Sequence, residues 1–497
     1  MVVDQIDRSI PIPIYYQLKE LIKKQIQTGI LKPGDQVETE EEICDRFGIS
    51  RTPVRQALLE LVHEGVLTRT AGRGTFVTFP EQREITLRVV VPDERWSWLL
   101  RDAASLWNEN NSPGNIKLVF STVPLADLHD RLSLLVAQGQ APDISILDSV
   151  WIAEFAHRSY LYPLSELDPK WALDVQNDFY PSILSANSYN GEQYALPTNA
   201  DATVLWYRRD WLSAEGLEPP RTWDELVSVG NYFCQPEIRA RYGLGPHPLA
   251  FVGGRAGGET TTYQLLPFIW SAGGAMITGN TVTLDSTATR QALVFIKSLV
   301  HQEQLASPDV VSSAWNGAAK AFAQEKAALA VGGTYENFII QSITGWDLQT
   351  FLSRVGFVPI PAGPGGSQTT LVGGMTYGIY RQSRFAQEAL DLLKLTLNTQ
   401  VLKPFSLRTG QNAAYIPVAQ AIQPEQDGFL GRTASLFTQG SSRPSLPAYD
   451  QVSRQFQEMV EACLTDRLSI EGAVSRTTER ISGITGFPVN EFLLRAS

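Results

Sequence analysis

Residues 39–61 contain the pattern that most constrains the fold, two short helices joined by a glycine. The Thr39 hydroxyl can accept from the Glu42 amide while the Glu42 carboxylate reaches back, which is a reciprocal cap at a helix start. Gly48 supplies the left-handed residue of a sharp turn. Ser50 is expected to cap the second helix. The segment therefore predicts a helix-turn-helix.

The second helix has one apolar stripe and one polar face. The stripe consists of Val54, Ala57, Leu58 and Leu61. On the other side Arg51 lies one turn from Arg55, and Thr52 lies one turn from Gln56. Reading of base edges in a major groove requires outward-pointing arginines and hydrogen-bonding side chains, and this face carries two of each. We therefore expect Arg51, Thr52, Arg55 and Gln56 to contact DNA.

Two strands are expected directly after this helix, over Val66–Thr70 and Thr75–Phe79. The turn between them is glycine-rich and carries Arg73 at its tip, followed by Gly74. A hairpin of this kind can lie against the phosphate backbone or place its arginine in a minor groove. Arg73 and Gly74 complete the predicted DNA-binding residues.

The stretch from IPIYYQLKE to GRGTFV resembles the winged-helix domain of the GntR family of bacterial regulators over about 65 residues. The resemblance implies that Arg51 and Arg55 contact DNA from the recognition helix and that Arg73-Gly74 forms the wing contact. It also implies a homodimer on a two-fold operator. One departure concerns Glu38-Thr39-Glu40-Glu41, where the family usually has a Pro-Ser-Glu-Arg-like sequence. Glu41 stands where an arginine is expected, so operator preference or affinity is expected to differ.

A single core rarely grows beyond roughly 250–300 residues, so a chain of 497 residues is expected to form at least two domains. The formal net charge is −11, but residues 1–80 hold 10 Lys and Arg against 11 Asp and Glu. A local basic surface can therefore exist on an otherwise acidic protein. We expect a DNA-binding domain at 1–80, a linker at 81–84 and an effector domain at 85–497.

After the linker, the apolar run Ile85–Val91 reads as a buried strand. Helical patterns then alternate with strands expected at Ile116–Phe120 and Asp143–Leu147, which favours an α/β architecture with a largely parallel sheet. Ligands of such sheets lie at the carboxyl ends of strands. The loops Pro92–Trp98 and Asp148–Trp151 qualify as ligand loops.

Nearly all of residues 85–490 resembles the bacterial extracellular solute-binding proteins that serve ABC importers of sugars. The segments that carry the resemblance are 141–144, 196–226, 318–337, 356–379 and 443–473, of which 196–226 matches best. The resemblance implies a type II periplasmic-binding-protein-like fold, with two α/β lobes closing on a small polar ligand, most simply a sugar or oligosaccharide. By position it assigns eight ligand-binding residues: Asp148, Trp151, Asn199, Asp201, Trp270, Tyr335, Gly374 and Asn412.

No secretion signal or lipid-anchoring cysteine is visible near the N-terminus, and no run of about 18 apolar residues occurs. The expected location is therefore the cytoplasm, with no membrane partner. The cysteines Cys44, Cys234 and Cys463 lie far apart and predict neither disulfides nor a zinc site. The five histidines show no metal spacing. We expect no metal, no cofactor and no enzymatic activity.

The predicted function is transcription regulation through double-stranded operator DNA, controlled by a small effector. One alternative is a solute-binding protein whose DNA-binding head is vestigial or architectural. Another is the class of GntR-headed chains with an aminotransferase-like domain that holds pyridoxal phosphate on a lysine. Lys297 and Lys394 sit within apolar helical patterns, and neither has the Ser-rich, aromatic-flanked loop typical of that cofactor.

Overall fold

The computed structural model describes residues 6, 8, 13–70, 72–78, 84–109, 114–422 and 428–490. The chain divides into two compact units, one spanning Met1–Thr86 with Ser105–Lys117 and the other Leu87–Ala104 with Leu118–Ser497. The first unit holds an N-terminal head, and the second holds most of an α/β module. Residues 79–83, which include most of the expected linker, lie outside the described residues, so the domain boundary stays a prediction.

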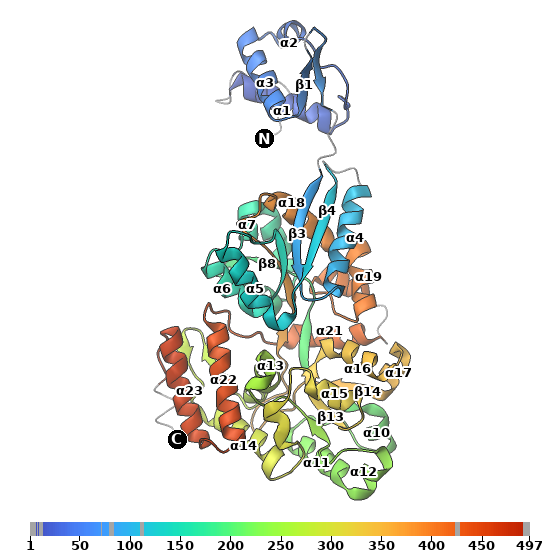
Figure 1. The fold of residues 1–497 in the computed structure, drawn as a ribbon, viewed down its shortest axis with the longest axis vertical. Helices are drawn as coiled ribbons and strands as arrows, with labels where there is room; N and C mark the ends of the chain where they lie inside the picture. The colour runs from blue at the N-terminus through green and yellow to red at the C-terminus, as the bar shows by residue number, and fades with distance from the viewer. Residues whose placement is uncertain are drawn as a thin grey trace. The chain divides into compact units, whose positions relative to one another are not determined.

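The head is a helix-turn-helix followed by a hairpin (Figure 1). Its elements are α1 (Ile14–Gln27), α2 (Glu40–Phe47), α3 (Arg51–His63), β1 (Leu67–Thr70) and β2 (Gly74–Val77). The capping box is confirmed, because Glu42 N donates to the Thr39 hydroxyl at 3.3 Å and Thr39 N donates to the Glu42 carboxylate at 2.8 Å. Gly48 takes the left-handed conformation at φ 62°. The predicted winged-helix architecture therefore holds.

The expected Ser50 cap is wrong. Ser50 has the extended backbone of an N-cap residue, but its side chain makes no capping hydrogen bond. Pro53 occupies the third helical position and has no amide hydrogen, so one of the two usual donors to a capping side chain is missing.

A small apolar core joins all five elements of the head. It contains Leu18, Ile22, Val37, Ile43, Ile49, Val54, Ala57, Leu58, Leu61, Leu67 and Val77. Lys19 of α1 adds ion pairs to Glu60 at 3.0 Å and Glu64 at 2.8 Å, near the end of α3. The recognition helix is thus held along its buried face and at its C-terminal end, and its N-terminal outer face stays open.

The module begins with a first lobe whose five-stranded sheet has the order β4-β3-β5-β16-β8. Its strands are β3 (Ile85–Val91), β4 (Ile116–Thr122), β5 (Ile144–Asp148), β8 (Ala195–Pro197) and β16 (Met375–Ile379). The helices of this part of the chain are α4 (Arg95–Glu109), α5 (Leu125–Ala137), α6 (Ile152–His157), α7 (Leu164–Leu167), α8 (Pro169–Val175), α9 (Pro181–Ala186), α18 (Ala386–Thr396), α19 (Thr399–Thr409) and α20 (Ile416–Ile422). A small hairpin joins β6 (Ser188–Tyr189) to β7 (Glu192–Gln193).

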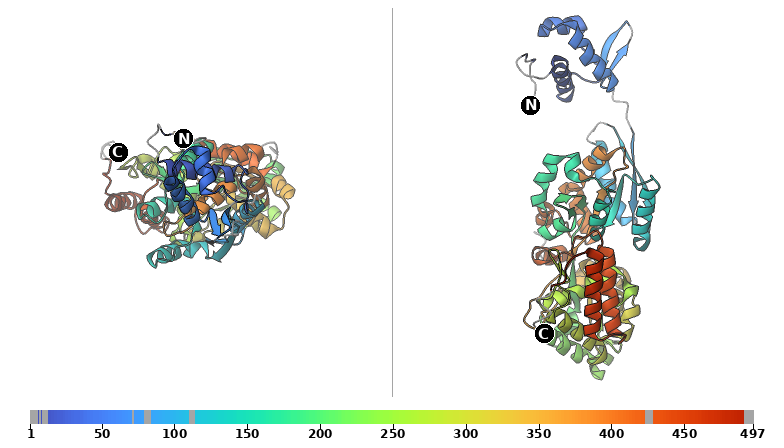
Figure 2. Two further views of the ribbon diagram at one scale, coloured as in Figure 1. Left: turned by 90° about the horizontal axis from the view of Figure 1, so that it is seen from above. Right: turned by 90° about the vertical axis from the view of Figure 1, so that its left-hand side faces the viewer.

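The second lobe is built on a sheet of order β10-β13-β9-β14, with β15 also paired to β9. Its strands are β9 (Asp201–Arg208), β10 (Leu249–Ala250), β13 (Leu329–Gly333), β14 (Val355–Val358) and β15 (Val372–Gly373), with a separate hairpin of β11 (Ile277–Thr278) and β12 (Thr281–Val282). The helices are α10 (Arg209–Ala214), α11 (Trp223–Cys234), α12 (Pro236–Tyr242), α13 (Glu259–Ser271), α14 (Thr287–His301), α15 (Gly317–Ala323), α16 (Asn337–Thr344), α17 (Leu348–Arg354), α21 (Phe429–Gln439), α22 (Tyr449–Leu464) and α23 (Ile470–Thr485). The last two helices lie side by side (Figure 2), and both pack against α14.

The sheets are mixed, which corrects the expectation of a largely parallel arrangement. β3 and β5 pair in parallel, as do β10 and β13, but β16 runs antiparallel to β5 and β9 runs antiparallel to β13. β9 and β16 are the strands by which the chain enters each lobe from the other. Such a strand has no preceding crossover helix in its own lobe to impose the parallel direction.

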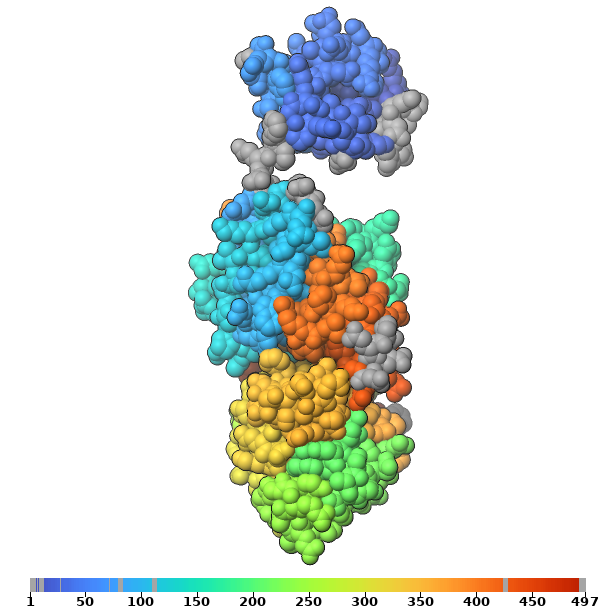
Figure 3. Space-filling model, turned by 90° about the vertical axis from the view of Figure 1, so that its right-hand side faces the viewer, coloured from blue at the N-terminus to red at the C-terminus, as the bar shows by residue number. Residues whose placement is uncertain are grey.

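The chain passes between the lobes more than once, so segments far apart in sequence meet. One passage joins β8 to β9, and a second joins β15 to β16. On one face of the first lobe, α4 and α19 lie together (Figure 3), where Arg408 stacks on Trp98 at 4.1 Å and approaches Asp102 at 3.6 Å. These passages bring residues from all parts of the module to one place.

Candidate functional site

The outer face of α3 presents Arg51 and Arg55, and the side chains of both are more than half exposed. Arg55 Nε donates to a Glu40 carboxylate oxygen at 2.7 Å, and Arg69 of β1 donates to the other oxygen at 3.0 Å. The Arg55 hydrogen bond, followed by that of Arg69, holds the pKa of Glu40 below its usual range. The Glu40 side chain is only 19% exposed. Because it bonds to both guanidinium groups, it orients both.

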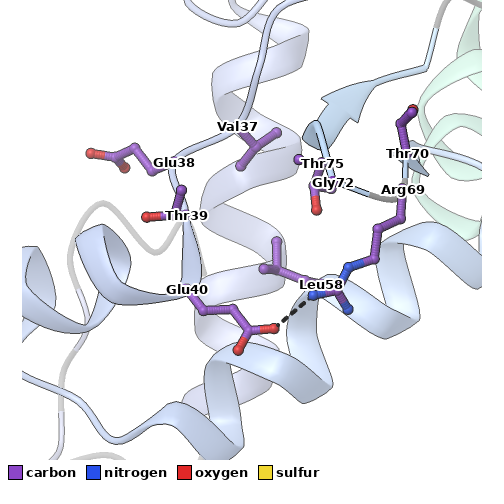
Figure 4. Close-up of a pocket in the computed structure, with 10 residues that line it drawn as sticks. Val37, Glu38, Thr39, Glu40, Leu58, Arg69, Thr70, Gly72 and Thr75 are labelled. Atoms are coloured by element: carbon purple, nitrogen blue, oxygen red, sulfur yellow. Dashed lines mark hydrogen bonds and ion pairs between the residues drawn. The ribbon is translucent and has the colours of Figure 1, made fainter.

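A hollow of about 470 Å³ lies beside this carboxylate, between the start of α2 and the hairpin. Its lining consists of Val37, Glu38, Thr39, Glu40, Leu58, Arg69, Thr70, Gly72, Gly74 and Thr75. Figure 4 shows the Arg69 side chain reaching across it to Glu40. Sequence analysis missed Arg69 and Glu40, because the signal that joins them is a contact between residues 29 positions apart.

The remaining residues predicted to bind DNA lie on the surface of the head. Thr52 is exposed, and Gln56 is exposed and donates to Glu60 at 3.3 Å. Arg73 is exposed on the hairpin turn, where its carbonyl accepts from the Gln36 amide at 3.3 Å. Gly74 has φ 118°, and a Cβ there would lie 2.6 Å from that amide nitrogen, so the turn requires glycine.

The module contains a cluster of polar residues from both lobes and the passages between them, which we call the interlobe cluster. Its members are Asp148, Asp201, Glu259, Tyr263, Tyr335, Arg443, Tyr449 and Ser453. Arg443 joins the lobes, because it donates to Glu259 of α13 at 2.8 Å and approaches Asp148, at the end of β5, at 3.6 Å. Only 6% of the Arg443 side chain is exposed. The guanidinium is thus a largely buried bridge between the first lobe and the second.

Hydroxyl groups surround the carboxylates of the interlobe cluster. Tyr263 donates to Asp201 at 2.8 Å, and Tyr449 donates to Glu259 at 2.8 Å. The Ser453 hydroxyl donates to the second oxygen of Glu259. The Tyr263 and Tyr335 rings are 5.9 Å apart. Carboxylates beside aromatic faces can accept hydrogen bonds from ligand hydroxyls while the rings cover apolar ligand surface.

Burial dominates the electrostatics of the cluster. It raises the pKa of Asp201 to about 6, and the nearby Asp148 carboxylate adds to this, while Tyr263 and Arg443 act in the opposite direction. Burial also raises the pKa of Glu259, against the lowering effect of Arg443. Three carboxylates therefore share one guanidinium, and two of them hold protons more tightly than usual.

The eight ligand-binding predictions fall into three groups in the structure. Asp148, Asp201 and Tyr335 belong to the interlobe cluster. Asn199 and Gly374 lie next to it, where the Asn199 side chain accepts from Met375 N at 2.9 Å. A Cβ on Gly374 would lie 2.2 Å from the Asn199 carbonyl oxygen. These two residues bring the two passages into close contact.

The other three predicted ligand residues lie in well-packed surroundings. Asn412 exchanges hydrogen bonds with Thr433 through its side chain, at 2.8 and 3.2 Å. Trp151 packs edge-on against His129 at 5.3 Å, beside the first-lobe core. Trp270 packs against the core of the second lobe. Their part in ligand binding stays a prediction.

A second hollow, of about 560 Å³, opens beside Glu259. It is lined by Arg255, Ala256, Gly258, Glu259, Asp450, Arg454, Gln457 and Glu461. Its lining is mostly charged or polar. Sequence analysis missed Glu259 and Arg443, whose 184-residue separation leaves no local pattern.

The described residues offer little that points to other chemistry. They contain no group of three or more His, Cys, Asp or Glu side chains placed to hold a metal ion. None of their helices is long and apolar enough to cross a membrane. Lys394 pairs with Asp168 at 2.7 Å, and Lys297 pairs with Asp466. Both lysines named for the pyridoxal phosphate alternative are thus engaged by carboxylates.

Comparisons with known proteins assign each part of the chain. Residues 14–77 match the bacterial regulatory proteins of the gntR family. The HTH-type transcriptional repressor NagR of Bacillus subtilis is 51% identical over 79 residues, which cover 16% of this chain and 32% of the repressor. The head is therefore a GntR domain.

The module has relatives of nearly its own length. A probable ABC transporter-binding protein of Deinococcus radiodurans is 28% identical over 364 residues, 69% of this chain and 80% of that protein. The maltose-bound T. maritima MalE3 structure superposes with a TM-score of 0.67 at 24% identity, over 80% of this chain and 99% of that one. A Thermotoga lettingae solute-binding protein bound with tagatose gives 0.68 at 21% identity, over 81% and 100%.

These structural likenesses confirm the two-lobed fold predicted for the module. The family described as bacterial extracellular solute-binding protein matches residues 99–401, more than half of the chain. Both families found are non-enzymatic families, one regulatory and one solute-binding. The chain therefore belongs to the bacterial extracellular solute-binding protein family and carries a GntR regulatory domain at its N-terminus.

Proposed function

We propose that the chain is a transcription regulator that binds operator DNA through the GntR head and senses a sugar or oligosaccharide through the module. The observation that carries the proposal is the fusion of the two families in one chain. The interlobe cluster supports a polar ligand, since it places carboxylates and tyrosine rings between the lobes. Solved structures of the same fold bind maltose or tagatose. Such a regulator acts in the cytoplasm, without catalysis.

In this proposal the outer face of α3 enters the major groove. Arg51 and Arg55 read guanines, Thr52 and Gln56 support them, and Arg73-Gly74 contacts the backbone or minor groove. Two copies of the chain bind a two-fold operator, since paired half-sites mirror the symmetry of a dimer. NagR is named a repressor, so release of DNA on ligand binding is the expected sign of regulation.

Ligand binding is proposed to change the operator affinity by about 5- to 150-fold, which corresponds to a coupling of roughly 1–3 kcal/mol. Asp148, Asp201 and Tyr335 contact the ligand, together with Glu259 of the same cluster. Asn199 and Gly374 shape the passage beside it. Trp151, Trp270 and Asn412 complete the proposed set at its periphery.

The test has a ligand arm and a DNA arm. All 11 tryptophans lie after Val91, so their fluorescence reports on the module without a signal from the head. The full chain is titrated with maltose, maltotriose, tagatose and ribitol, and operator binding is then measured with and without each ligand that binds. Asp201→Asn is expected to weaken ligand binding, whereas Asp174→Asn, an exposed change of the same kind on α8, is not.

In the DNA arm, a binding sequence is first selected from random double-stranded DNA. Arg55→Ala is expected to weaken binding by about 1–3 kcal/mol and to relax the preference at one base pair. Arg454→Ala removes the same charge from the module and serves as the control. A ligand that binds the module and leaves operator affinity unchanged would overturn the coupling. Unchanged affinity in Arg55→Ala would overturn the proposed interface.

A further inference from the structure

The first turn of α2 carries three consecutive glutamates with three different environments. Glu42 closes the capping box with Thr39. Glu40 is largely buried between Arg55 and Arg69. Glu41 takes part in neither arrangement, and 75% of its side chain is exposed, with a carboxylate oxygen 3.5 Å from Arg51 Nη2. The capping box and the arginine pair therefore leave the third carboxylate without a structural task of comparable strength.

Stability does not account for the position of Glu41. An exposed ion pair such as Arg51–Glu41 contributes little, with a median near 0–1 kcal/mol. On a surface that approaches DNA, a carboxylate also repels the phosphates, so it opposes the nonspecific part of binding. A side chain that costs affinity at the recognition face can still contribute if it favours one base over the others.

A carboxylate accepts hydrogen bonds and donates none. In the major groove the only base-edge donors are the N4 amino group of cytosine and the N6 amino group of adenine. Adenine presents its N7 acceptor beside that amino group, which repels a carboxylate, whereas guanine and thymine present only acceptors or a methyl group. Cytosine is therefore the base that an exposed glutamate on this face fits best.

We propose that Glu41 is a specificity-determining residue that accepts a hydrogen bond from the N4 amino group of a cytosine, within one base-pair step of the guanine contacted by Arg51. The two side chains meet on this face, with 3.5 Å between Arg51 Nη2 and a Glu41 carboxylate oxygen, so they can reach neighbouring base pairs. Glu40 has the separate task of orienting Arg55 and Arg69. This inference rests on the proposed DNA contact of α3.

The experiment compares the full chain with Glu41→Ala in selection from random double-stranded DNA. The unaltered chain is expected to select cytosine next to the Arg51 guanine, and Glu41→Ala is expected to lose that preference by about 5- to 30-fold while it keeps the guanine. Glu20→Ala, which removes a glutamate from α1 of the same head, is expected to leave the whole selected sequence unchanged.

A base analogue isolates the amino group. In the selected operator the cytosine is replaced by pyrimidin-2-one, which lacks the 4-amino group. The unaltered chain is expected to lose the same factor in affinity as on mutation of the base, and Glu41→Ala is expected to be indifferent to the replacement. Circular dichroism of each variant verifies that the head is folded.

Three outcomes would overturn the inference. Glu41→Ala that binds all sequences more tightly with the same base preferences would make Glu41 a repulsive charge only. Loss of both the cytosine and the guanine preference would make it a positioning residue for Arg51. Equal sensitivity of both proteins to the analogue would exclude the N4 contact. If Arg51→Ala and Arg55→Ala bind like the unaltered chain, the proposed interface itself fails.

Discussion

Replacement of Arg443 by methionine is expected to destabilise the module strongly. Among the eight residues that define the interlobe cluster, Arg443 is the one with a positive charge. Its side chain is 6% exposed, with Glu259 at 2.8 Å and Asp148 at 3.6 Å. Removal of one partner from a buried ion pair costs about 3–5 kcal/mol, because the remaining charge is left without compensation. Both carboxylates keep 24–29% exposure, so we expect a loss near 3 kcal/mol.

The assay is guanidinium unfolding of the full chain, followed by tryptophan fluorescence. Arg454→Met is the matched control, because it removes an arginine that is 68% exposed and paired with Asp450 at 2.7 Å. That surface pair is expected to contribute less than about 1 kcal/mol. Equal midpoints and equal slopes for the two variants would refute the argument that burial makes the Arg443 ion pairs more stabilising than a surface pair.

The deficit of Arg443→Met is also expected to depend on pH. Loss of the guanidinium removes an effect that lowers the pKa of Asp201 and Glu259, so both folded-state pKa values rise further. A carboxyl group whose pKa is raised on folding contributes stability at low pH that is lost as pH rises through the folded pKa. The difference between Arg443→Met and the unaltered chain should therefore be smaller at pH 5 than at pH 7.5.

Two further changes probe the module. Burial raises the pKa of Glu336 to about 8, so the folded state holds a proton that the unfolded chain releases near pH 4.5. As the pH rises towards about 8, the free energy of unfolding of the unaltered chain should fall relative to that of Glu336→Gln, by up to about 1.4 kcal/mol per pH unit. Parallel pH profiles of the two proteins would contradict this. Gly374→Ala should lower the melting temperature, with a cost of about 1–3 kcal/mol from its clash with the Asn199 carbonyl. Gly483→Ala, which has open space in helix α23, should not lower it.

Local patterns in the sequence predicted the head well because its elements are stabilised by neighbours in the chain. The Thr39–Glu42 box and the turn at Gly48 each depend on residues within a few positions. The Ser50 side-chain cap is absent, and Pro53 locally removes one of the two amides that could donate to it. The strand Ile85–Val91 was predicted with its exact bounds, because a continuous apolar run between polar segments is a strong signal.

The interlobe cluster shows where such patterns end. Asp148, Asp201 and Tyr335 were reached through a resemblance of whole segments, and nothing around Glu259 or Arg443 marks them as partners. Their meeting depends on the repeated passage of the chain between lobes, which also sets the antiparallel strands that the alternation of helices and strands did not indicate. Long-range pairing of this kind leaves no periodicity in the sequence.

Because Arg55 and Arg69 share the Glu40 carboxylate, a substitution at one position affects the other. If Arg69 is replaced, Glu40 pairs with Arg55 alone and binds it more firmly. DNA must then compete with this ion pair for Arg55. A change on the hairpin thus alters a contact on the helix without touching it. Substitutions at 55 and 69 should therefore be non-additive in operator affinity. Attempts to redirect the head to a new operator have to change the three residues as a set.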